Sequence, residues 1–139
     1  MIGLLNDLNF RMNIDQQLLD DLTAQAQASP RLRMNMDLRD SSDDQSQRML
    51  NALEPGTVLP IHRHRKTSET VAILRGRAVQ YLYDDDGKET GSVLLEAGGE
   101  IPAMQVEMGQ WHRLESLESG TVIVEFKNGA YEPIGPEDI

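Results

Sequence analysis

The chain has 139 residues, and its 13 lysines and arginines against 23 aspartates and glutamates give a formal net charge of −10. This length fits one domain with its own hydrophobic core, and the acidic balance argues against nonspecific binding to nucleic acid or to an anionic membrane. Because the chain has no cysteine, it cannot use disulfides, thiolate zinc sites or a cysteine nucleophile. The opening residues lack the features of a signal peptide and no apolar run would span a bilayer, so we expect a cytoplasmic protein.

The first part of the chain begins with signals for a helix and a strand. Asp15 can cap a helix over residues 15–29, in which leucines share one face, namely Leu18, Leu19 and Leu22. Apolar and polar residues then alternate over residues 32–38, which predicts a half-buried strand.

A second, shorter helix is predicted over residues 41–53. Its first residues are of the types that cap helices, and Met49, Leu50 and Leu53 recur at helical spacing before Pro55. We therefore interpret residues 1–54 as a helix, strand and helix extension that packs on the rest of the molecule.

From Gly56 onward, short runs of β-forming residues alternate with turn residues. The runs are 57–61, 70–74, 78–83, 92–95 and 121–126, and glycine-containing turns separate most of them. This spacing is typical of an all-β barrel or sandwich, so we predict a mainly β fold with a barrel core over residues 55–127. Residues 128–139 contain glycines and prolines and are predicted to form a surface coil.

The three histidines of the chain and one glutamate form a candidate metal site. His62 and His64 lie two residues apart in an extended stretch, so their imidazoles leave the same face. The turn-like link that follows could bring Glu69 back beside them, and His112 is the third histidine. Nitrogen and oxygen donors suit one divalent iron, manganese, nickel, copper or zinc ion, whereas the absence of thiolates weakens a structural zinc site.

The stretch from Gly56 to Gly76 resembles the first motif of the cupin superfamily. Its pattern G-x5-H-x-H-x4-E-x6-G has every fixed position filled, with the fixed ligand residues His62, His64 and Glu69. This resemblance implies a jelly-roll β-barrel that holds a metal on those residues and on the histidine of a second motif.

The second cupin motif, G-x5-P-x-G-x2-H-x3-N, is matched only in part. Gly109 and His112 keep their spacing, but Glu107 stands where proline is usual and Ser116 where asparagine is usual. The opening glycine is displaced to Gly98 or Gly99. These departures concern the geometry of the loop more than the ligand His112.

Within the cupins, the chain is similar to the WbuC-type group of small metalloproteins. That similarity lies in the layout and in residues 47–56 leading into His62-Arg63-His64. It implies one bound metal, no established reaction and a place in surface polysaccharide (O-antigen, lipopolysaccharide) biosynthesis. We expect the metal to take a small anionic or sugar-derived ligand. A non-catalytic metal-dependent sensor or binding module and a cupin sugar isomerase or epimerase are the alternatives, and the sequence names no catalytic residue.

Further residues are candidates for contacts with such a ligand. If the strand that starts at Glu69 alternates without a bulge, Arg75 points into the barrel and could bind a carboxylate or phosphate. A structural ion pair is the equal alternative for Arg75. Tyr81 and Tyr83 alternate on the next strand, where either could donate a proton to a ligand or pack in the wall.

We also expect a homodimer. Trp111, the leucine face of the first helix and the alternating strand over residues 32–38 offer more apolar surface than one small barrel obviously covers.

Overall fold

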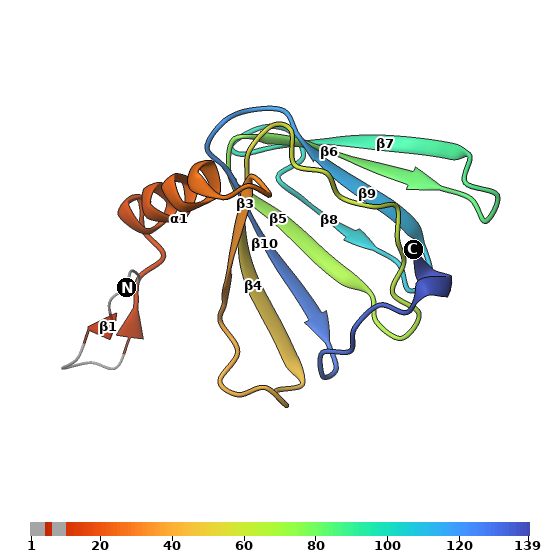
Figure 1. The fold of residues 1–139 in the computed structure, drawn as a ribbon, viewed down its shortest axis with the longest axis horizontal. Helices are drawn as coiled ribbons and strands as arrows, with labels where there is room; N and C mark the ends of the chain where they lie inside the picture. The colour runs from red at the N-terminus through yellow and green to blue at the C-terminus, as the bar shows by residue number, and fades with distance from the viewer. Residues whose placement is uncertain (1–4, 7–10) are drawn as a thin grey trace.

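The computed structural model describes residues 5–6 and 11–139 of the chain as two large antiparallel sheets and a small hairpin with one N-terminal α-helix (Figure 1). Helix α1 spans Gln16–Ala28, with Asp15 accepting a hydrogen bond from the Leu18 amide at its start. The strands are β1 (Leu5–Asn6), β2 (Arg11–Met12), β3 (Arg33–Asp37), β4 (Ser46–Leu53), β5 (Glu69–Arg75), β6 (Arg77–Tyr83), β7 (Glu89–Glu96), β8 (Ala103–Val106), β9 (Trp111–Ser116) and β10 (Thr121–Asn128). A short 3-10 helix, η1, covers Pro136–Asp138 near the C-terminus.

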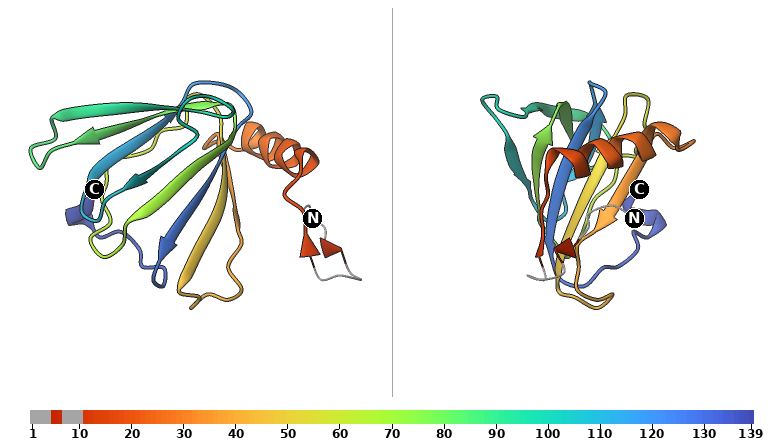
Figure 2. Two further views of the ribbon diagram at one scale, coloured as in Figure 1. Left: turned by 180° about the vertical axis from the view of Figure 1, so that it is seen from behind. Right: turned by 90° about the vertical axis from the view of Figure 1, so that its left-hand side faces the viewer.

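The two large sheets form the layers of the molecule. One has the strand order β3-β4-β10-β5-β8 and the other the order β7-β6-β9. The chain passes from β5 to β6 where the sheets meet, and from there the sheets diverge, with α1 against the outer face of the five-stranded sheet (Figures 1 and 2). The predicted mainly β fold with a helical N-terminal segment is therefore confirmed.

The alternation of β10 shows how the core is divided. Val122 and Val124 face α1 and pack with its leucines, whereas Ile123 faces the other sheet and packs with Val71 and Leu114. Each layer of apolar side chains lies on one side of the five-stranded sheet, as the period of two along a strand requires.

The helix predicted over residues 41–53 is wrong, because strand β4 occupies Ser46–Leu53. Leu50 and Ala52 face α1, whereas Leu53 belongs to the core between the sheets. Since β4 lies between β3 and β10 with apolar residues on both faces, its sequence does not alternate cleanly and matches a helical spacing by chance. This strand of the predicted extension pairs along its whole length with β10 of the predicted barrel core.

The leucine face of α1 is covered within the chain itself. Leu18, Leu19 and Leu22 are buried against the five-stranded sheet, with Met34 and Met36 of β3 beside them. The three leucines therefore offer no free surface to a second copy, whereas Met34 and Met36 are only partly buried, and the homodimer stays a prediction. Neither helix in the described part of the chain has both the length and the apolar character needed to cross a membrane.

Gly76 joins the two sheets in a position that only glycine fits. Its φ of +82° lies in the left-handed region, and an added Cβ would come within 2.8 Å of the Thr121 Cα. Gly87 has nearly the same φ, +81°, but a Cβ there would meet no described atom within 4 Å. The two glycines share the same backbone conformation and differ in the space around them.

We predict that Gly76→Ala destabilises the protein more than Gly87→Ala does. The left-handed conformation costs either alanine about 1–2 kcal/mol, and overpacking against Thr121 adds about 1–3 kcal/mol at position 76 alone. Urea denaturation of both variants measures the difference in free energy of unfolding. Equal losses in the two variants would show that the junction at Gly76 has room to adjust.

Candidate metal centre

The backbone holds two of the histidines directly opposite each other. The His62 amide donates to the His112 carbonyl at 3.0 Å, and the His112 amide donates to the His62 carbonyl at 2.9 Å. His112 lies on β9, whereas His62 lies in the extended loop between β4 and β5. The expected strand over residues 57–61 is wrong, since those residues form no strand and the described loop has an isolated β-bridge to β9 at His62.

His64 completes a cluster of three imidazoles. The Gly109 amide donates to the His64 carbonyl at 2.8 Å, which ties this part of the loop to the turn before β9. One ring nitrogen from each of His62, His64 and His112 lies within 4.8 Å of the others. The ring centroids are 4.3 Å apart for His62 and His112 and 5.0 Å apart for His62 and His64. This spacing allows three nitrogens to bind one ion.

Hydrogen bonds to the backbone orient two of these rings. Nδ1 of His62 lies 3.0 Å from the Pro60 carbonyl, and Nδ1 of His112 lies 2.8 Å from the Gln110 carbonyl. Because a carbonyl oxygen only accepts, each neutral ring carries its proton on Nδ1 and leaves the Nε2 lone pair free. This arrangement is typical of histidines that bind metals, since it fixes both the tautomer and the direction of the ring.

Glu69 lies beside the histidine cluster at the start of β5. Its Oε1 is 3.4 Å from Nε2 of His112, and its Oε2 is 3.5 Å from Nε2 of His64. In the described chain, these two Nε2 atoms and Oε2 are buried without a hydrogen-bond partner. Buried polar atoms rarely lack partners, so a converging set of them fits a divalent ion that binds through nitrogen and oxygen.

The charges around the cluster favour the forms that bind a metal. Burial would raise the pKa of Glu69, but His112 and the Lys127 ammonium outweigh it and lower that pKa to about 2. Burial and Lys127 lower the pKa of His64 to about 4. Burial and the neighbouring His112 also lower the pKa of His62. His62 and His64 are therefore neutral and Glu69 is ionised at neutral pH.

His112 differs from the other two histidines. Burial would lower its pKa, but the Glu69 carboxylate reverses this effect and raises it. His112 is thus the ring of the cluster that holds a proton most strongly, and a metal must displace that proton to bind there.

Arg75 does not lie where the sequence placed it. Its guanidinium contacts helix α1, with 2.9 Å to Asp20 Oδ1 and 2.6 Å to Gln16 Oε1. The pairing of β5 with β10 shifts by one residue at Leu74, and this bulge turns Arg75 to the outer face. Arg75 lies at the other end of β5 from Glu69 and takes the structural role of an ion pair with α1.

Tyr81 and Tyr83 also point away from the histidines. They pair with Arg113 and Trp111 across β9, whereas His112 pairs with Leu82. Paired residues share a face of the sheet, so both tyrosines lie on the face opposite to His112. Their hydroxyls contact neighbours on that face, where Tyr81 donates to Glu115 at 3.0 Å and Tyr83 accepts from Arg113 at 3.4 Å.

Lys127 and Glu125 are site residues that the sequence analysis missed. Lys127 pairs with Glu69 across β5 and β10, and its Nζ lies 3.5 Å from Glu69 Oε2 and 4.0 Å from Glu125 Oε2. Burial and the Glu69 charge raise the pKa of Glu125. The signal was present in the alternation of β10, where Ile123, Glu125 and Lys127 share one face.

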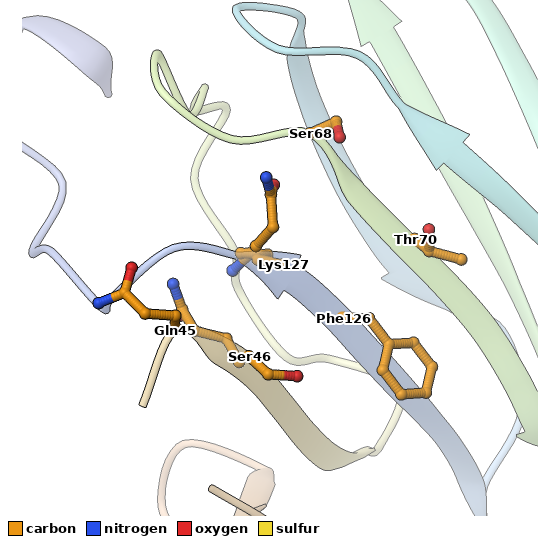
Figure 3. Close-up of a pocket in the computed structure, with 8 residues that line it drawn as sticks. Gln45, Ser46, Ser68, Thr70, Phe126 and Lys127 are labelled. Atoms are coloured by element: carbon orange, nitrogen blue, oxygen red, sulfur yellow. The ribbon is translucent and has the colours of Figure 1, made fainter. Parts of the chain in front are cut away.

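A surface cavity of about 360 Å³ lies between the ends of β4, β5 and β10. Figure 3 shows Phe126 and Lys127 on β10, with Thr70 on the neighbouring strand β5 and Ser68 just before that strand. The cavity is lined by Gln45, Ser46, Gln47, Ser68, Thr70, Phe126, Lys127 and Asn128. Lys127 therefore borders both this cavity and the carboxylate of the histidine cluster.

Several solved structures resemble this fold. KdgF from Halomonas sp. superposes with a TM-score of 0.59 and 14% identity over 74% of this chain and 84% of its own. CapF, the capsular polysaccharide assembling protein of Staphylococcus aureus, superposes with a TM-score of 0.61 and 18% identity. The match covers 71% of this chain but only 27% of CapF. An oxalate oxidase in complex with glycolate superposes with a TM-score of 0.60 and 16% identity. The match covers 78% of this chain and 56% of the oxidase. These likenesses show the fold, which is cupin-like.

No curated protein matches the sequence significantly. A family model does match residues 14–95, and it is described as a domain of unknown function, DUF6016. Since the match covers more than half of the chain, the chain belongs to the DUF6016 family.

Proposed function

We propose that the protein binds one divalent transition metal through His62, His64, Glu69 and His112, and that the metal holds a small anionic or sugar-derived ligand. The observation that carries the proposal is the convergence, at the histidine cluster, of buried polar atoms of His64, His112 and Glu69 that lack hydrogen-bond partners in the described chain. Buried polar groups cost free energy unless they are paired, and one ion would satisfy all of these atoms together.

The composition of the site indicates the kind of ligand. Three neutral imidazoles and one carboxylate leave a divalent ion with a net positive charge, which favours an anion with oxygen donors. When bound, such an ion supplies Lewis acidity or an oxygen-activating centre at its remaining positions. The described residues contribute the rest of the site: His62 and His112 are held by backbone carbonyls, and Glu69 is enclosed between the sheets.

We further propose a role in surface polysaccharide biosynthesis. The support is the similarity to WbuC-type cupins in the layout and in residues 47–56 leading into His62-Arg63-His64. The likeness to CapF concerns the fold, and CapF itself is a capsular polysaccharide assembling protein. Turnover of nucleotide sugars and sugar acids, measured with and without metal, separates an enzyme from a metal-dependent binding module.

The first test is the metal content of His64→Ala. We predict about one divalent ion per wild-type chain, because the ligand set can serve one centre, and loss of most of that metal in the variant. Tyr81→Phe is the matched control, since it changes a side chain on the opposite face of the sheet and should keep its metal. Elemental analysis measures all three proteins, and full occupancy in His64→Ala would contradict the ligand assignment.

The second test is the binding of oxalate or glycolate. We predict that metal-loaded protein binds these anions and that metal-free protein does not, because the metal supplies the positive charge and the open positions. Titration calorimetry on both forms measures the two affinities. Equal binding by the metal-free form would place the ligand away from the histidine cluster.

A further inference from the structure

Lys127 brings a second cation into the interior of the barrel. Its side chain is 21% exposed and contacts Glu69, which is 5% exposed. Lys127 is also one of the residues that line the cavity at the ends of β4, β5 and β10 (Figure 3). An ammonium in this position can be reached from outside and still lies next to the metal donors.

The charges around Lys127 change when a metal binds. Without a metal, the ammonium is shared between the Glu69 and Glu125 carboxylates, at 3.5 and 4.0 Å. A divalent ion on Glu69 engages that carboxylate and leaves the ammonium with a weaker partner. The Lys127 ammonium would then add a positive charge beside that of the ion, 3.5 Å from the Glu69 carboxylate.

Resting on the proposed function, we propose that Lys127 binds the anionic group of the ligand that the metal holds. Arg75, the cation that the sequence suggested for this role, is engaged with Asp20 and Gln16 on α1. Lys127 instead lies on the interior face, opposite Glu69 in the pairing of β10 with β5. A ligand carboxylate or phosphate could contact the metal and the Lys127 ammonium at once.

The test compares Lys127→Met with Lys66→Met. Lys66 is a matched control because, among the described residues, its ammonium pairs with the exposed Glu132 and not with the site. We expect Lys127→Met to keep its metal at saturating concentration and to bind oxalate about 10- to 150-fold more weakly, the loss expected for one charge-assisted hydrogen bond. Lys66→Met should bind oxalate as wild type does, and Lys127→Arg should recover part of the affinity.

The outcomes separate this inference from the proposed function. Oxalate affinity in Lys127→Met equal to that of wild type, with metal bound in both, would overturn the role of Lys127 alone. If Lys127→Met binds metal more weakly but binds oxalate with unchanged affinity, Lys127 only balances the negative charge of Glu69. That result would also overturn the inference. If metal-loaded wild type binds no oxalate, the ligand part of the proposed function fails instead.

A separate set of contacts links the C-terminus to the histidine loop. Asp138 Oδ1 accepts hydrogen bonds from Nε of Arg63 at 2.8 Å and of Arg65 at 2.6 Å, and the Arg63 amide donates to the Asp138 carbonyl at 3.0 Å. Asp138 is 8% exposed. The Arg63 guanidinium also lies 4.6 Å from the centre of the Trp111 ring. These contacts join the neighbours of His64 to the neighbour of His112.

We infer that Asp138 is a positioning residue for the metal site, which again rests on metal binding by the histidines. The arginines on both sides of His64 are held by one carboxylate, so the loop is fixed from the face opposite to the imidazoles. Without Asp138, the loop has to be ordered when the metal binds, and that cost lowers the affinity.

The test is the metal affinity of Asp138→Ala, measured by competition with a chromophoric chelator. We expect a loss of about 10- to 100-fold, as for other residues that orient metal ligands. Asp138→Asn keeps an acceptor for the arginines and should lose less. Glu132→Ala, which removes only the exposed tail contact with Lys66, should bind metal as wild type does.

Equal metal affinity in Asp138→Ala and Glu132→Ala would overturn this role. If Asp138→Ala fails to fold, Asp138→Asn and Arg65→Ala carry the same comparison. A wild-type chain that binds no metal would contradict the proposed function itself.

Discussion

The burial of the Glu69 carboxylate between the two sheets is the constraint on which the site depends. An ionised carboxylate in such a place costs several kcal/mol unless charges and hydrogen bonds compensate it. His64, His112 and Lys127 surround Glu69 for this reason, and together they hold its pKa at about 2. The loop between β4 and β5 supplies His64, β9 supplies His112 and β10 supplies Lys127. All three segments must therefore meet at the start of β5, where Glu69 lies.

Much of the fold could be predicted because its signals are local. Helix α1 has a capping aspartate and a leucine face, and β3, β5, β6, β7 and β10 lie in runs of β-forming residues. The clustering of His62, His64 and His112 could be predicted as well, since the pair is close in sequence and the third is the remaining histidine. Strand β4 could not be predicted, because apolar residues on both of its faces hide the period of two.

Errors in the site arose from register and from distant pairing. One extra residue at Leu74 changes the face of Arg75, and a sequence carries no reliable mark of such a bulge. The role of Lys127 follows only when β10 is paired with β5 so that Lys127 lies opposite Glu69. Asp138 acts on arginines more than seventy positions earlier in the chain, a contact for which a single sequence offers no signal.

The alternation of β10 also bears on how this protein could change over evolution. Val122 and Val124 secure the strand against the helix, whereas Glu125 and Lys127 belong to the interior that carries the candidate chemistry. Substitutions at functional positions often cost stability, which limits how far a site can diverge. Here the apolar side chains that pack against α1 lie on one face of β10, and the polar side chains lie on the other. The polar residues could therefore be substituted to suit different ligands while the packing against α1 keeps the strand in place.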